Sequence, residues 1–414
     1  MRAGKTNPVV ITGAGMITAL GRSPDETWKE LLAGRSGIGP ITDFDARGFR
    51  WQAAAQVRGF PPSGPASQPK WARIADLHTY LLLQCCGDAL RAAGVGSSVD
   101  PEDIGLFVGM GTVDYKLPDL VPAVLASRGG DGSFDHAAFF VRGFERLYPL
   151  FALSMLNNVS ACLAAIELGI KGENAVFAAD ATAGAQALGE ALQTLREEKA
   201  KAVLAGGVSE KLTPMSLARS QLTEPGDSAE SAGMAPGEGC AMVCLELRAR
   251  ADQRGARCAV ALTGYGHAFG AAGDASSATA AIAAAMQAAL DRAELRPDDV
   301  EVVLAHHDGT AADRSEAEAV RRVFGASSSR QTVCASKPFL GHLGPAAPAA
   351  DLVLAAQALR HQTVAPALAV ARDVARARPG SEERAQRYRS VLINARSSEG
   401  HASSLVVQSL DSLE

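Results

Sequence analysis

The sequence predicts an α/β fold made of two similar halves. Short apolar runs, typical of buried strands, alternate along the chain with longer segments whose apolar residues recur at helical spacing. Several segments of the first half return in the second half in the same order, and a repeated sequence indicates a repeated structure. Since strands alternate with helices, we expect mostly parallel sheets with helices on their faces.

Four pairs of matching segments carry this repeat, and they divide the chain into residues 1–250 and 251–414, joined near residues 248–257. The pairs, with the first-half member named first, are residues 10–15 with 261–266, 101–108 with 297–304, 201–204 with 389–392, and 238–241 with 399–402.

Composition excludes several classes of protein. The net charge is −5, and no basic stripe is interleaved with aromatic residues, so we expect no nucleic-acid partner. No apolar run reaches the ~18 residues that span a membrane. A strand pattern begins so close to the N-terminus that it leaves no room for a signal peptide, and we expect a cytoplasmic protein.

We also expect no metal and no cofactor. The seven cysteines form no C-x-x-C pair and most lie in apolar periodic segments, which favours reduced, buried thiols, Cys162 among them. The G-x-G of residues 13–15 is a weak indication of a dinucleotide site, because Thr18 stands where a third glycine belongs.

The stretch from residue 173 to 190 reads as a strand, a turn of small residues and a helix. The apolar run 175–179 is the strand, and apolar residues at helical spacing begin after the turn. Such a turn presents one side chain at a helix N-terminus, where a cysteine would have a lowered pKa and act as a nucleophile. This chain has the platform without the nucleophile, because the turn offers Ala181.

Two turns of the second half carry polar side chains at corresponding places. The strand 300–305 ends at His306, and the strand 332–336 runs through a turn containing Lys337 and His342 into a helix. Strand ends and helix starts converge near the axis of a duplicated α/β pair, so these residues and Ala181 are expected to face one pocket. The alternative, that the histidines are ordinary core or surface residues, stays open.

The segment 112–149 is less regular and rich in aromatic residues: Phe134, Phe139, Phe140 and Phe144. It fits two descriptions, an excursion packed on the core or a lining for an apolar ligand, and the sequence does not choose between them.

Along nearly its full length the chain resembles the β-ketoacyl-[acyl carrier protein] synthases of the thiolase-like superfamily. The segments VVITGAGMITALG, AVLAGGVSE, PGEGCAMVCLE and DRSEAEAVRRVFG are similar to family segments. The family motifs A-H-G-T-x-T and S-x-K-S-x-x-G-H are matched by residues 305–310 and 336–342. The resemblance implies a thiolase-like fold with duplicated αβαβα layers, and an acyl carrier protein as partner.

Departures from the family pattern concern catalysis. The family's nucleophilic cysteine lies in a T-A-C-x-S-G turn, and here Ala181 occupies its place. The C-terminal G-F-G-G-T-N loop is replaced by residues 397–402, with Ser398 at the gating phenylalanine's position. The loop between His306 and Glu316 is one residue shorter, and Pro348 lies close to where a helix N–H is needed.

These departures favour a silent subunit, known as a chain length factor, that pairs with an active ketosynthase and shapes its acyl tunnel. The family-matched residues Ala181, His306, Lys337, His342 and Glu316 would then be vestigial. By resemblance, the strand carrying Val176 and Ala178 forms the subunit interface, and Phe134, Phe139, Phe140 and Ser398 lie along the tunnel or interface. Two alternatives remain: a free-standing malonyl decarboxylase that uses both histidines, and a non-catalytic homodimer that binds acyl carriers.

Overall fold

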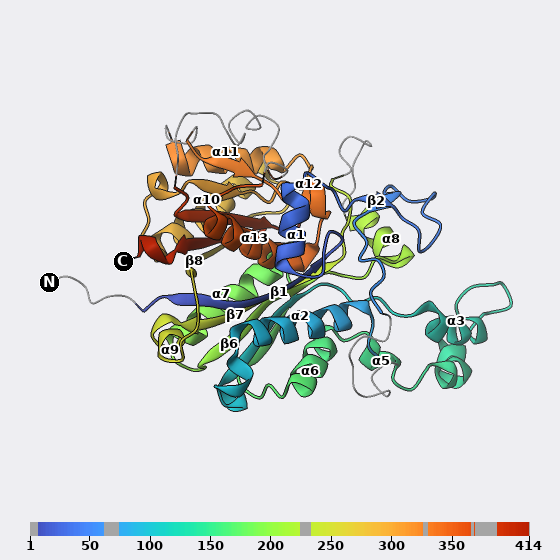
Figure 1. The fold of residues 1–414 in the computed structure, drawn as a ribbon. Helices are drawn as coiled ribbons and strands as arrows, with labels where there is room; N and C mark the ends of the chain where they lie inside the picture. Colours follow the sequence, from blue (N-terminus) through green and yellow to red (C-terminus); the bar gives the residue numbers. More distant parts are fainter. Residues whose placement is uncertain are drawn as a thin grey trace.

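The computed structural model describes residues 7–61, 74–223, 233–325, 330–365, 368 and 387–413, and Figure 1 shows its fold. Ten strands of these residues form one sheet, in the order β10-β9-β11-β12-β8-β1-β7-β6-β4-β5. A separate pair is formed by β2 (Gly39–Pro40) and β3 (Ala53–Ala54). The strands of the large sheet are β1 (Val9–Thr18), β4 (Ile104–Met110), β5 (Asn174–Phe177), β6 (Ala202–Val208), β7 (Gly239–Leu247), β8 (Val260–Phe269), β9 (Val302–Leu304), β10 (Thr332–Cys334), β11 (Ser390–Arg396) and β12 (His401–Ser409).

The strand order repeats from the two edges inward. Read inward from one edge, the first half contributes β5, β4, β6, β7 and β1, which are its third, second, fourth, fifth and first strands in the sequence. Read inward from the other edge, the second half contributes β10, β9, β11, β12 and β8, which have the same order within that half. The four matching segment pairs begin in or just before β1 and β8, β4 and β9, β6 and β11, and β7 and β12. The two halves share one sheet, where separate sheets were expected, because β1 pairs with β8 through Val9 and Val10.

The α/β thiolase-like architecture is confirmed, with a sheet that is mixed. The expected parallel pairing holds among the outer three strands of each half, β5-β4-β6 and β10-β9-β11. The inner strands β7 and β12 run antiparallel to both of their neighbours. For β12 the reason is the short turn after Arg396, since a connection of a few residues joins only antiparallel strands.

The helices form three layers around the two halves of the sheet. Helix α2 packs on β1 and β7, and α10 packs on β8 and β12, so these two cover the outer faces (Figure 1). Helices α7 and α13 contact strands of both halves and form the middle layer. The helices are α1 (Pro24–Leu32), α2 (Leu77–Ala93), α3 (Leu117–Ala126), α4 (His136–Ala138), α5 (Phe151–Ser154), α6 (Asn157–Leu168), α7 (Ala183–Arg196), α8 (Pro214–Thr223), α9 (Arg248–Gln253), α10 (Ala275–Arg292), α11 (Asp313–Phe324), α12 (Lys337–Leu340) and α13 (Ala347–His361).

The middle layer explains the composition of α13. Nearly every residue from Ala347 to Leu359 is buried, since the helix lies between the two halves of the sheet and has no solvent face over that length. Helix α13 begins at Ala347, which places Pro348 in its first turn. The N–H groups of a first turn have no partner within the helix, so this proline removes no hydrogen bond.

The aromatic segment between β4 and α6 stands away from the layers (Figure 1). Its phenylalanines pack on one another: the ring centroid of Phe139 lies 5.6 Å from that of Phe134, 5.5 Å from Phe140 and 6.4 Å from Phe144. Phe140 is 75% exposed and Val141 76% exposed. The description as a segment packed on the core is therefore wrong for these side chains.

The cysteine expectations hold in part. Cys85 and Cys86 are buried between α2 and β7, but Cys162 is exposed on α6, so its assignment to the core was wrong. Within the described residues, no helix is both long and apolar enough to cross a membrane.

Three glycines allow the middle layer to approach the first-half strands. A Cβ atom on Gly207 of β6 would lie 2.2 Å from the carbonyl oxygen of Pro345, and one on Gly184 of α7 would lie 2.3 Å from the same oxygen. A Cβ on Gly109 of β4 would lie 2.3 Å from the nitrogen of Gly184. These contacts involve backbone atoms, so a side chain would force the elements apart.

We predict that Gly207→Ala lowers the free energy of unfolding by about 1–3 kcal/mol, because overpacking displaces the turn at Pro345. Chemical denaturation of the variant measures this. Gly96→Ala is the matched control, since a Cβ at Gly96 meets no atom within 4 Å. Equal stability of the two variants would show that the turn is free to move.

Candidate functional site

The turn before α7 has the geometry that the sequence predicts. Strand β5 ends at Phe177, a short 3-10 turn covers Asp180–Thr182, and α7 begins at Ala183. The Thr182 hydroxyl donates to the carbonyl oxygen of Ala179 at 2.8 Å and closes the turn. Ala181 is completely buried at this helix start. Its methyl group has no lone pair, so this position holds no nucleophile.

None of the seven cysteines is among the residues that line the cavity in front of this turn. Burial raises the pKa of Cys86 and Cys240 well above the usual value and that of Cys244 to about 12, which keeps these thiols protonated and unreactive.

His306 follows β9 and is held in one tautomer by its neighbours. Its Nδ1 accepts from the backbone N–H of Arg396 at 3.3 Å and lies 3.3 Å from Lys337 Nζ. Because both neighbours are donors, the proton of the neutral ring is on Nε2, which lies 3.4 Å from Asp308 Oδ2. Burial and the charge of Lys337 lower the pKa of His306 well below its usual value, so the ring is neutral at pH 7.

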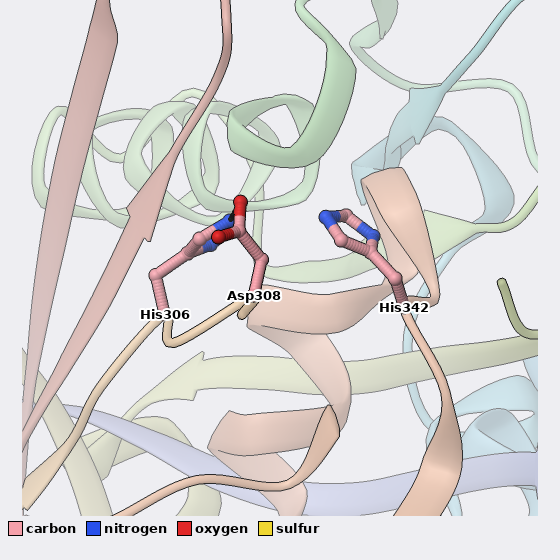
Figure 2. Close-up of side chains that lie close together, drawn as sticks. All are labelled: His306, Asp308 and His342. Atoms are coloured by element: carbon pink, nitrogen blue, oxygen red, sulfur yellow. Dashed lines mark ion pairs between the residues drawn. The ribbon is translucent and has the colours of Figure 1, made fainter. Parts of the chain in front are cut away.

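His342 is held in the same tautomer by the turn at the start of the middle layer. The backbone N–H of Gly344 donates to its Nδ1 at 2.9 Å, which leaves the proton on Nε2. Figure 2 shows this imidazole pointing toward His306 and Asp308, and the two histidine ring centroids are 5.4 Å apart. Burial and Lys337 lower the pKa of His342 to about 4.

Asp308 places a carboxylate beside both imidazoles. Ligand-type atoms of Asp308, His306 and His342 all lie within 4.8 Å of one another. Burial alone would raise the pKa of Asp308, but bonds to His306 and the charge of Arg396 hold it far below its usual value. The guanidinium of Arg396 pairs with Asp308 and also donates to Thr310 Oγ1 at 3.0 Å. The carboxylate is therefore ionised and fixed in place.

Lys337 and Glu316 form the support behind the histidines. Lys337 is 1% exposed, and its Nζ donates to the carbonyl oxygen of His306. Burial lowers the pKa of Lys337, an effect that Asp351, Asp308 and Glu316 oppose. Glu316 accepts from the backbone N–H groups of His306 at 2.8 Å and His307 at 3.0 Å. These two residues position the His306 loop.

The arrangement is unsuited to a metal ion although three ligand-type residues meet. Both Nδ1 atoms already accept backbone N–H groups, and both Nε2 atoms carry the ring protons. A cation would also face Lys337 Nζ, which lies 3.3 Å from His306 Nδ1, and the guanidinium of Arg396, which pairs with Asp308. We therefore place no metal in this cluster.

A cavity of about 510 Å³ lies in front of the turn and the histidines. Of the residues that the sequence singled out, His342, Ala178 and Ser398 line it. His306 and Lys337 lie directly behind Asp308, and Ala181 lies behind Asp180, which lines the wall. Phe134, Phe139, Phe140 and Val176 are not among the lining residues, whereas Met155 and Leu156 are.

Sequence reasoning missed four residues of this site: Asp180, Asp308, Arg396 and Asp351. Asp308 stood two positions after His306 in a stretch already singled out, and its charge was the available signal. Arg396 ends β11, and Asp351 is a carboxylate inside the apolar helix α13. A charge within an apolar periodic segment indicates a buried partner, here Lys337.

Comparison with known proteins identifies the family. The family model described as "Beta-ketoacyl synthase, N-terminal domain" matches residues 6–251, and "Beta-ketoacyl synthase, C-terminal domain" matches residues 261–371. The chain belongs to the β-ketoacyl synthase family. It is 30% identical over 388 residues to the 3-oxoacyl-[acyl-carrier-protein] synthase 2 of Coxiella burnetii and 27% identical over 382 residues to that of Staphylococcus aureus, with 87% of each chain covered in both comparisons.

Solved structures of this β-ketoacyl synthase family share the fold. The ishigamide ketosynthase/chain length factor is 23% identical with a TM-score of 0.75, over 97% of this chain and 99% of that one. A β-ketoacyl synthase from Burkholderia phymatum is 24% identical with a TM-score of 0.78, over 98% and 100%. At these identities the likeness concerns the fold alone.

The neutral histidines of the site predict that stability falls in mild acid. An unfolded histidine binds a proton below about pH 6.5, whereas folded His342 does so only near pH 4. Between these values the unfolded state holds more protons, so the free energy of unfolding falls by up to about 1.4 kcal/mol per pH unit for this residue.

Thermal unfolding at pH 7 and pH 5 tests this. We expect His342→Asn, whose side-chain oxygen retains an acceptor for Gly344, to lose less stability between the two pH values than the unmodified chain. His136→Asn, at an exposed histidine, serves as the control and is expected to behave like the unmodified chain. An unchanged pH dependence in His342→Asn would contradict the assignment of a neutral ring.

Proposed function

We propose that this chain is a chain length factor, the non-condensing β subunit that pairs with an active ketosynthase in type II polyketide or fatty-acid-like biosynthesis. The observation that carries the proposal is Ala181, a buried methyl group at the position from which a nucleophile would be presented. The curated relatives are named as synthases, so this alanine is the reason to separate the chain from their activity. Its likeness in fold to a ketosynthase/chain length factor is in keeping with the proposal.

The free-standing decarboxylase receives less support from the geometry. That reaction develops negative charge on a carbonyl oxygen, which the two histidine N–H groups would have to stabilise. Asp308 lies against His306 Nε2 and carries a fixed negative charge, so a second anion there would be repelled. No specific observation favours the carrier-binding homodimer.

An unpaired strand edge and an apolar surface support the need for a partner. Strand β5 pairs with β4 on one side and is the edge of the sheet on the other, with Val176 half-buried and Ala178 exposed. The exposed apolar side chains of the aromatic segment include Leu125, Phe134, Phe140, Val141 and Phe144. Edge strands and apolar patches of this kind are liabilities in a monomer. In the proposed complex, an active ketosynthase covers the β5 edge and the apolar surface, and an acyl carrier protein serves the pair in the cytoplasm.

We predict that the chain co-purifies with a ketosynthase subunit as a one-to-one complex when the two are expressed together. Expressed alone, it should be poorly soluble or form a weak homodimer, because the edge and the apolar surface are uncovered. Size-exclusion chromatography with light scattering distinguishes these states. A stable, well-behaved monomer at micromolar concentration would argue against the subunit role.

A second prediction concerns product length. In the proposed complex, Phe134, Phe139 and Phe140 border the far end of the partner's acyl tunnel, so removing a ring makes room for a longer chain. We expect each Phe→Ala variant to lengthen the product by one or two extension units with little change in rate, since each buried methylene of a tail contributes about 0.8 kcal/mol.

Mass spectrometry of the products made by the complex measures this. Phe269→Ala is the control, because that ring is 65% exposed and lies on β8, outside the aromatic segment. If all three complexes assemble and make the original product, the aromatic segment does not set length.

A further inference from the structure

The cavity wall carries carboxylates whose charge is not neutralised. Asp180 and Glu399 both line the cavity, next to Ser398 and His342. Among the described residues, neither has a lysine, arginine or histidine nitrogen within ion-pair distance. The cations of the same wall are already paired: Lys211 lies 3.1 Å from Asp76, and Arg219 pairs with Asp114 and Glu210.

Asp180 is placed there by an unusual backbone conformation. Its φ is 46°, in the left-handed region that residues with a side chain rarely adopt and that aspartate tolerates better than most. Such conformations concentrate at functional sites. The side chains of Asp180 and Glu399 are both exposed to the cavity. Partial desolvation raises the pKa of Asp180, and the negative charges of Glu399 and Asp308 act in the same direction, whereas the backbone N–H of Ala181 and the charge of Lys337 oppose them.

The remaining groups at this end of the cavity do not offset the charge. His306 and His342 are neutral at pH 7, and Lys337 is fully buried behind them, bonded to His306. Arg396 is engaged by Asp308 and Asp313. Asp308, the third carboxylate of this wall, lies beside the imidazole pair (Figure 2) and is the one that Arg396 neutralises. Asp180 and Glu399 therefore remain uncompensated, since the N-terminus of α7 contributes only about half a positive charge, and an anionic acyl group beside them is disfavoured.

We propose that this cavity selects acyl groups by charge: Asp180 and Glu399 exclude anionic groups such as malonyl, and admit neutral or cationic groups of the same size. The inference rests on the proposed non-condensing role and adds a ligand class to it. Selection of this kind works by placing an unfavourable charge against the wrong ligand. In a complex with a ketosynthase it would leave malonyl groups to the partner's site.

Three pantetheine thioesters of similar length test the proposal: malonyl, butyryl and 3-aminopropionyl, which carry one negative, no and one positive charge. Binding is measured by calorimetry on the purified protein, with its partner subunit when the two co-purify. We expect malonyl-pantetheine to bind at least about tenfold more weakly than butyryl-pantetheine, and 3-aminopropionyl-pantetheine at least as tightly as butyryl. In the Asp180→Asn, Glu399→Gln double variant the difference should fall to about twofold or less.

Glu145→Gln is the control, since Glu145 is an exposed carboxylate outside the cavity lining, and it should keep the full difference. Glu399→Gln alone replaces the double variant if the turn at Asp180 does not tolerate asparagine, and it should remove part of the difference. Equal binding of malonyl and butyryl groups by the unmodified protein would overturn the proposal, as would failure to bind the butyryl compound. Either result leaves the co-purification test of the subunit role unaffected. If no partner co-purifies, the order of affinities for the three thioesters is still measured on this chain alone.

Discussion

The close contact between the start of α7 and the turn at Gly344–Ala346 determines where the groups of the site lie. The carbonyl oxygen of Pro345 approaches Gly184 and Gly207 so closely that neither position accommodates a side chain. This contact holds the turn at Ala181, which belongs to the first half, against the His342 turn, which belongs to the second. The site is a product of packing between two repeats, since no single segment contains it.

The polar groups behind the histidines then decide what the site is able to do. Backbone N–H groups of Arg396 and Gly344 occupy the two Nδ1 atoms, so both rings present N–H groups and neither presents a lone pair. The same rings would serve an oxyanion well if no other charge were close. Asp308, however, places a negative charge beside His306 Nε2, and Arg396 keeps this carboxylate ionised. The proposed non-condensing role is thus supported by the charge of Asp308 as well as by the alanine at position 181.

Much of the fold was predictable from the sequence because it depends on repeated local patterns. The matching segments gave the correct equivalence of β1 with β8 and of β4 with β9, and apolar runs located those strands. Two features were not accessible. The antiparallel direction of β7 is set by tertiary packing, and the β1–β8 pair that joins the halves involves only two residues of each strand. Of the site, His306, Lys337 and His342 were found at their turns, but the place of Asp180 depends on a left-handed backbone that its neighbours in sequence do not encode.

The position of the phenylalanines of the aromatic segment was also not predictable from the sequence. Composition shows that this segment is apolar, but it does not show which surface covers it.

The middle layer has a consequence for the synthesis of the protein. Helix α7 leaves the ribosome long before α13, yet both are buried between the two halves of the sheet. Until residues 347–361 have been translated, α13 does not cover the inner side of the first half. The apolar face of α7 is then open to solvent or to other nascent chains. Folding is therefore completed only after synthesis of the second repeat, and chaperone occupancy during elongation is expected to be highest over the interval between α7 and α13.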